Sequence, residues 1–387
     1  MTTNKNHNSP NVPNLRFPEF TEEWEKHLLT DFMSFKNGMN PEAKRFGNGV
    51  KFISVMDILN NQFIYYDNIR ASVEIADSDL DTYGVNYGDI LFQRSSETLE
   101  DVGQANVYLD SKPAVFGGFV IRGKSKGNYN PSFFRYLLTS PTVRKRVIVK
   151  GAGAQHFNIG QDGLSKVCID IPCIKEQEKI ARLLALLDER IATQNKIIED
   201  LKKLKSAISE RLFKSVKGSI VLLSDICDIV KGKQINGENL SERGRYYVMN
   251  GGTEPSGYYD DYNVEANTIS ISEGGNSCGY VQFNTFPFWS GGHCYSIQNV
   301  TGNVDNLYLY HYLKSNEDNI MKLRIGSGLP NIQKKDLAMF KIIVPTLEQQ
   351  MTISTFLSSI ERKAEIERRI QNAIQKQRLY LLQQMFI

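Results

Sequence analysis

Several loops of the sequence combine cations, amides and glycines, the residue types with which proteins contact nucleic acid. Arg and Lys bind phosphates or guanine, Asn and Gln can hold adenine at two atoms, and glycine lets the backbone come close. Such loops recur in both halves of the chain, which favours a function over an ordinary solvated surface. The candidate DNA contacts are Lys36, Lys44, Arg45, Arg94, Ser95, Gln155, His156, Asn158, Lys231, Lys233, Gln234, Asn276, Arg324, Gln333 and Lys334.

Two motifs in the first half could instead belong to an enzyme. The run Gly118–Ser125, GFVIRGKS, matches the phosphate-loop pattern, in which Lys124 would bind a nucleotide. Its four central residues predict a strand instead of a flexible loop, and no helix follows to hold the phosphates. The NPSF tetrapeptide at Asn130 resembles the motif of adenine methyltransferases, but a helix N-cap followed by a first-turn proline also explains it. We therefore expect no catalytic residue, with a nucleotide-dependent enzyme as the alternative.

Composition restricts the function further. The net charge of +3 permits nucleic-acid binding without requiring it. The five cysteines include no C-x-x-C pair, so we expect neither a metal site nor a disulfide framework. No apolar run has membrane-spanning length and the N-terminus is not signal-like, which predicts a soluble cytoplasmic protein with no membrane partner.

The candidate loops connect short β-like runs, and each set of runs is followed by one long helical run. The helical runs, residues 175–217 and 346–387, contain neither Gly nor Pro, and their apolar residues recur three and four positions apart. Residues 51–58, 88–93 and 166–172 are among the runs that predict strands. A helix of about forty residues is roughly 60 Å long, and its narrow apolar stripe predicts pairing with the other long helix.

The chain contains the same unit twice. An offset of 173 residues relates the start of the first helical run to that of the second: Pro172 to Pro345, Gln177 to Gln350 and Ile180 to Ile353. A shared framework with different inserts is typical of modules with separately diverged recognition surfaces. The predicted segments are a lead at 1–20, a first globule at 21–172, a long helix at 173–217, a second globule at 218–345 and a long helix at 346–387.

The duplicated helices, the P-x-x-x-x-Q-x-x-I pattern at both helix starts and the opening LRFPEFTEEWE resemble the specificity subunit of a type I restriction-modification enzyme. The resemblance covers nearly the whole chain. It implies an α+β fold in which two mixed α/β target-recognition domains form a pseudo-two-fold repeat, separated by two long helices in an antiparallel coiled coil. It also implies double-stranded DNA as the ligand, a bipartite asymmetric site read with one domain per half-site, and a chain that is not itself catalytic.

The resemblance further implies protein partners. Two methyltransferase (M) subunits would carry S-adenosylmethionine, and restriction (R) subunits would use ATP and Mg, so this chain needs no cofactor of its own. A coiled-coil scaffold with two protein-binding heads is a second alternative. The long helices would dock the M subunits, and the helix residues expected there are Gln177, Ile180, Leu184, Leu187, Gln350, Ile353, Leu357 and Ile360.

Overall fold

The computed structural model describes residues 10–153, 156–326, 328 and 330–387, and it divides into two compact units. Unit 1 takes Met1–Thr193 with Gln371–Ile387, and unit 2 takes Gln194–Ile370. The long helices are α7 (Ile174–Ser215) and α12 (Leu347–Gln384). Each unit therefore contains one globule, the start of one long helix and the end of the other.

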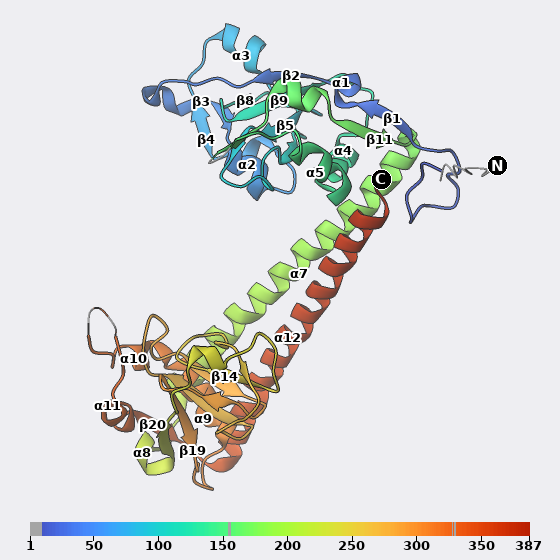
Figure 1. Ribbon diagram of the computed structural model, residues 1–387. Coiled ribbons are helices and arrows are strands. Elements are labelled where there is room, and N and C mark those ends of the chain that lie inside the picture. Colours follow the sequence, from blue (N-terminus) through green and yellow to red (C-terminus); the bar gives the residue numbers. More distant parts are fainter. Residues whose placement is uncertain (1–9, 154–155, 327, 329) are drawn as a thin grey trace, which may run out of the picture. The chain divides into compact units, whose positions relative to one another are not determined.

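Unit 1 is built from helices and short strands, and the strands form two sheets and the two-stranded ribbons β1–β11 and β6–β10. One sheet is antiparallel in the order β2-β9-β5-β7, the other has the order β4-β3-β8, and β1 pairs with β11. Helix α4 contacts β7 and lies beside the start of α7 (Figure 1). The elements are β1 Glu25–Leu28, α1 Leu29–Phe32, β2 Met33–Asn37, β3 Phe46–Ile53, α2 Val55–Asn60, β4 Ala71–Val73, α3 Asp77–Tyr83, β5 Ile90–Gln93, β6 Ser95–Ser96, β7 Ala105–Val107, β8 Val115–Phe116, β9 Val120–Ser125, α4 Pro131–Thr139, α5 Pro141–Ile148, β10 Phe157–Asn158, α6 Gln161–Ser165 and β11 Cys168–Ile171, with 3-10 turns at Ala43–Arg45 and Tyr66–Asn68.

Unit 2 repeats the two sheets and the β1–β11 ribbon of unit 1. Its sheets have the orders β13-β19-β16-β17 and β15-β14-β18, and β12 pairs with β20. Each three-stranded sheet contains one parallel pair, β3 with β8 in unit 1 and β14 with β18 in unit 2. The elements are β12 Ser219–Leu222, α8 Leu223–Ile226, β13 Asp228–Lys231, β14 Tyr246–Met249, β15 Tyr258–Tyr259, β16 Thr268–Ser272, β17 Val281–Asn284, β18 Trp289–Ser290, β19 Cys294–Gln298, α9 Asn306–Ser315, α10 Glu317–Met321, α11 Lys334–Ala338 and β20 Lys341–Val344, with a 3-10 turn at Gly237–Asn239.

The long helices run antiparallel within each unit, because the start of one meets the end of the other. In unit 1, Ile180 and Leu184 of α7 share an apolar cluster with Leu381 of α12 and with Phe386, which follows α12. In unit 2, Phe213 of α7 shares a cluster with Leu357 of α12. These contacts bury the narrow apolar stripe of each helix, as the residue spacing predicts.

One ion pair anchors the helix pair to the globule in each unit. In unit 1, Arg378 of α12 pairs with the buried Asp188 of α7, which also accepts a hydrogen bond of 2.8 Å from the Tyr136 hydroxyl of α4. The same arrangement recurs in unit 2. There Lys205 of α7 pairs with Glu361 of α12, and the Tyr310 hydroxyl of α9 donates to Glu361 at 3.0 Å.

Two motifs that suggested an enzyme are parts of the framework. Residues Val120–Ser125 of the GFVIRGKS run form β9, and Arg122 within it is buried, so the run is not a phosphate-binding loop. Asn130 is the N-cap of α4, since its side-chain oxygen accepts a hydrogen bond of 2.9 Å from the Phe133 amide, and Pro131 is the first helical residue. Both interpretations made from the sequence are confirmed.

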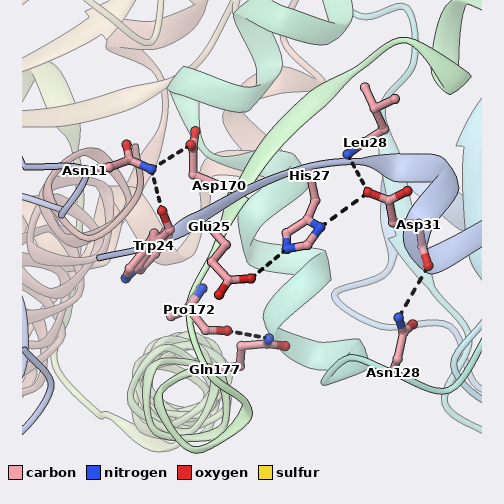
Figure 2. A network of polar contacts seen from close by, with 10 residues as sticks. All are labelled: Asn11, Trp24, Glu25, His27, Leu28, Asp31, Asn128, Asp170, Pro172 and Gln177. Carbon is pink, nitrogen blue, oxygen red and sulfur yellow. Dashed lines mark hydrogen bonds and ion pairs between the residues drawn. The ribbon is translucent and has the colours of Figure 1, made fainter. Parts of the chain in front are cut away.

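Two expectations differ from the structure. The run 51–58 is not one strand, because β3 ends at Ile53 and α2 begins at Val55. Within the lead at 1–20, the polar residues 1–14 also predict disorder, and residues 1–9 lie outside the described part. Asn11, however, is ordered against the globule, because its side-chain amide donates to the Trp24 carbonyl at 2.6 Å and to the Asp170 carboxylate at 3.0 Å (Figure 2).

Candidate nucleic-acid interface

One edge of the four-stranded sheet gathers the candidate loops of unit 1. Strand β2 ends at Asn37 opposite Ile121, and β5 ends at Gln93 opposite Val120. Because β9 runs antiparallel to both neighbours, the end of β2, the end of β5 and the start of β9 lie at the same edge. We call this edge the loop edge of unit 1.

Four predicted residues lie together at the loop edge of unit 1. Ser95 pairs with Asn158 across β6 and β10, and their side chains are hydrogen-bonded. Arg94 precedes this pair, and its guanidinium donates to the Gly118 carbonyl at 3.3 Å. His156 and Asn158 are exposed. A guanidinium, an amide and an imidazole thus share one surface from which they can donate to phosphates or base edges.

Unit 2 has the corresponding loop edge. Lys231 at the end of β13 is opposite Tyr295, and Ser272 at the end of β16 is opposite Cys294 at the start of β19. The loop that follows β16 bridges to Asn331 through Gly274, as Ser95 bridges to Asn158 in unit 1. Asn331 and Asn158 are separated by the repeat offset of 173 residues, so the pairing of the loops is repeated as well as the sheet.

A carboxylate organises the loop edge of unit 2. Glu273 is buried, and its Oε1 accepts from Lys231 Nζ at 2.7 Å and from the Tyr295 hydroxyl at 3.1 Å. Burial raises the pKa of the Tyr295 phenol, which keeps it in the protonated, donating form. Lys231 keeps 54% of its side chain exposed, so its charge is held in place at the surface.

The other candidate residues have less uniform surroundings. Arg45 donates to the Glu74 carbonyl and pairs with Asp79 at 3.1 Å, so it joins β4 to α3. The pKa of Asp79 is lowered, first by the Ala76 backbone N–H and then by Arg45. Lys36 lies over the Tyr83 ring, with the ammonium 5.4 Å from the ring centroid. Lys44 is exposed beside Glu42. Of the candidates in unit 2, Gln333 is half-buried, and the exposed ones are Lys233, Gln234, Asn276, Arg324 and Lys334. The candidate Gln155 of the first half lies outside the described residues.

Sequence reasoning missed two residues at the loop edges, Phe119 and His293. Each follows a Gly-Gly pair in the turn that enters β9 or β19, and each is exposed. The recurrence of the Gly-Gly pair in both halves was a visible signal. An apolar residue such as Phe119 does not match a search for cations and amides, so it was not selected.

Most of the helix residues expected to dock partners are buried or half-buried by contacts within their own unit. Gln177 is 2% exposed, and its amide donates to the Pro172 carbonyl at 2.9 Å (Figure 2). Its side-chain oxygen accepts from the Asn130 amide at 3.0 Å. Gln350 makes the same two bonds in unit 2, to Pro345 and Asp305. Ile180, Leu184 and Leu357 are buried, while Leu187, Ile353 and Ile360 are half-buried. The buried side chains hold each helix start to its globule and present no free surface.

A further network surrounds the start of α7 (Figure 2). His27 of β1 lies 3.3 Å from both Glu25 and Asp31, and the Asp31 carboxylate also accepts from the Leu28 amide at 3.0 Å. Asn128 donates to the Asp31 carbonyl at 3.3 Å. These bonds fix α1 between β1 and the loop before α4, which positions the globule on the helix.

Neither a metal site nor a membrane helix is found in the described part of the chain. No group of three or more His, Cys, Asp or Glu side chains there could hold a metal ion. No helix there is sufficiently long and apolar to span a membrane. All five cysteines are free thiols, and burial raises the pKa of Cys294 to about 11.

The comparisons with known proteins agree with this architecture. The family model of the type I restriction modification DNA specificity domain matches residues 21–203 and 218–376. The MjaVIII specificity subunit of a type I restriction enzyme from Methanocaldococcus jannaschii is 24% identical over 426 residues, with 96% of this chain and 93% of that protein covered. The crystal structure of a type I restriction-modification S subunit from M. genitalium has a TM-score of 0.65 at 18% identity, covering 97% of this chain and 99% of that one.

A second solved chain, from work on the assembly of a type I R-M system, has a TM-score of 0.55 at 14% identity and covers 93% of this chain and 96% of its own. At these identities the two structures support the fold alone. The family model matches both halves over most of their length. The chain therefore belongs to the family of type I restriction-modification specificity subunits, with two DNA specificity domains.

Proposed function

We propose that this chain reads a bipartite, asymmetric DNA site, with one unit per half-site, and positions methyltransferase and restriction subunits on it. The observation that carries the proposal is the repeated loop edge with different side chains. Arg94, Ser95 and Asn158 occupy it in unit 1, while Lys231 and Asn276 occupy it in unit 2. Two different surfaces on one framework suit two half-sites of different sequence.

The division of chemistry follows from this role. The described residues supply hydrogen-bond donors at the loop edges, and we assign no nucleophile or acid–base pair to them. Adenine methylation with S-adenosylmethionine, and cleavage with ATP and Mg, then belong to the M and R subunits. The chain selects the sequence on which those subunits act.

Docking of two M subunits would use exposed apolar side chains of the long helices. Two pairs of such residues recur at the repeat offset: Ile174 with Leu347, and Ile197 with Ile370. Their side-chain exposures are 44% and 46% in the first pair, and 38% and 37% in the second. Equivalent exposed positions on both helices suit two copies of one partner.

Exchange of one recognition surface tests the proposal. Residues 29–167 are replaced by the corresponding segment of another family member, which keeps the β1–β11 ribbon and both long helices. Single-molecule methylome sequencing of cells that carry the chimera and its M subunit should show a methylated site changed in one half only. The matched chimera replaces residues 223–340 and should change the other half. Changes in both halves from one exchange would refute reading by separate units.

A further inference from the structure

The turn that enters β9 has the same packing in unit 1 as the turn that enters β19 in unit 2. A side chain on Gly38 would collide with the Gly117 carbonyl, and one on Gly232 would collide with the Gly291 carbonyl. The following glycine is just as confined, because a Cβ on Gly118 would collide with the Asn40 side-chain oxygen. In unit 2 the Gln234 oxygen meets Gly292 in the same way. The backbone of each Gly-Gly turn is therefore fixed by close packing.

The residue after each Gly-Gly pair is fixed by the same backbone hydrogen bond. The Phe119 carbonyl accepts from the Arg94 amide at 2.8 Å. The His293 carbonyl accepts from the Glu273 amide at 2.9 Å. Arg94 and Glu273 each directly follow the central strand, β5 or β16, so both turns are held to the same point of the framework.

The side chains at this fixed position differ and point to different chemistry. Phe119 is 68% exposed, beside the Arg94 guanidinium that donates to the Gly118 carbonyl. His293 is exposed too, and its own amide is bonded to the Asn250 side chain at 3.1 Å. A phenyl ring held in water on a rigid turn gains by covering an apolar group, whereas an imidazole can donate to an acceptor.

We propose that Phe119 and His293 each determine one base of their own half-site, an inference that rests on the proposed function. Phe119 contacts the 5-methyl group of a thymine in the major groove, where that methyl distinguishes thymine from every other base. His293 donates to the acceptor edge of a purine in the other half-site. The rigid turns fix the positions of the two side chains, and the change from phenyl to imidazole makes the two half-sites differ in the base they require.

The test uses the full chain in complex with its M subunits, after the wild-type site has been read by methylome sequencing. Each thymine of the first half-site is replaced in turn by deoxyuridine, which removes only the methyl group. Wild-type binding should weaken about fourfold at one thymine, the value of one buried methyl group. Phe119→Ala should bind both DNAs equally at that position. His293→Ala should relax one purine position of the other half-site.

Matched controls separate this inference from its alternatives. Tyr87 is 62% exposed but precedes β5, at the opposite edge of the same sheet, so Tyr87→Ala should discriminate as the wild type does. A first half-site without a thymine contact, or undiminished discrimination by Phe119→Ala, overturns the role of Phe119 while the proposed function stands. Wild-type binding with no sequence preference overturns both.

Discussion

Replacement of Gln177 should destabilise unit 1 by removing two hydrogen bonds that tie α7 to the residues before α7 and before α4. The buried amide donates to the Pro172 carbonyl before α7 and accepts from the Asn130 amide before α4. Gln177→Ala leaves a buried donor and a buried acceptor unpaired, at about 1–3 kcal/mol for each. We therefore expect unit 1 to lose about 2–5 kcal/mol of unfolding free energy.

Gln177→Glu sharpens the expectation, because a carboxylate can accept from Asn130 but cannot donate to Pro172. Only the protonated acid restores that donation, so the folded-state pKa of the new side chain should lie above the ordinary value of about 4.3. The variant should then approach wild-type stability below about pH 4.3 and lose it as the pH rises through the raised pKa, by about 1.4 kcal/mol per unit of pKa difference.

Fluorescence can report each unit separately, because Trp24 lies in unit 1 and Trp289 in unit 2. Urea unfolding of Gln177 variants in a Trp289→Phe background follows Trp24 alone. The exposed Lys175 of α7 provides a control within unit 1, and Lys175→Ala should change the unfolding free energy by less than about 0.5 kcal/mol. A Gln177→Ala variant as stable as this control would refute the assignment of Gln177 as a framework residue.

Two further predictions concern buried groups. Asp188→Ala should lower the unfolding free energy of unit 1 by about 3 kcal/mol, since it leaves the Tyr136 hydroxyl and Arg378 without their partner. Glu361→Ala should destabilise unit 2 less, because Glu361 keeps 36% of its side chain exposed. Equal losses of unfolding free energy in urea would contradict this order. Burial lowers the pKa of His311 to about 4, so the folded protein favours the neutral imidazole. The unfolding free energy of unit 2 should therefore fall by about 3 kcal/mol as the pH falls from about 6.5 to 4. His311→Gln should flatten that part of the pH profile of Trp289 unfolding, and an unchanged profile would exclude His311 as its cause.

Strong periodicity made the long helices predictable, and a short apolar run after a glycine did the same for β5, whereas α2 was not predicted. The run SVMDI is short, apolar and β-branched, so periodicity alone cannot distinguish a strand from a buried helix there. The decisive signal was local: Ser54 precedes α2 and its hydroxyl donates to Asp57 at 2.7 Å, within a capping box. Weighing the cap above the apolar run would have predicted the helix.

The candidate site was predictable as a set of loops but not as an arrangement. Arg94 and Asn158 were selected for their chemistry, yet their approach depends on the pairing of β6 with β10, which joins residues far apart in sequence. For the helices, the residues expected to dock partners include several that are buried within their own unit. Helical periodicity marks the face that a helix buries, and Ile180 and Leu184 lie on that face and pack inside unit 1. A docking surface must be sought among exposed apolar residues instead.

The repeat itself separates framework from recognition. At Gln177 and Gln350 both the residue and its bonds are kept, as expected where a buried donor and acceptor must be paired in each unit. At Phe119 and His293 the backbone bond is kept and the side chain changes, which costs little because both side chains lie in solvent. Positions of the second kind can diverge without loss of the fold, so new base preferences can arise there.

One difference between the copies makes the two helix starts unequal. Glu176 of α7 is fully buried and accepts two hydrogen bonds of 2.7 Å from Arg16, which belongs to the segment before β1. Its repeat counterpart on α12 is Gln349, which is exposed. Since this N-terminal segment precedes only the first globule, it covers the start of α7 without an equivalent on α12. If two identical M subunits dock as proposed, they meet different surfaces at the two helix starts, and this asymmetry gives the assembled complex a direction relative to the proposed asymmetric DNA site.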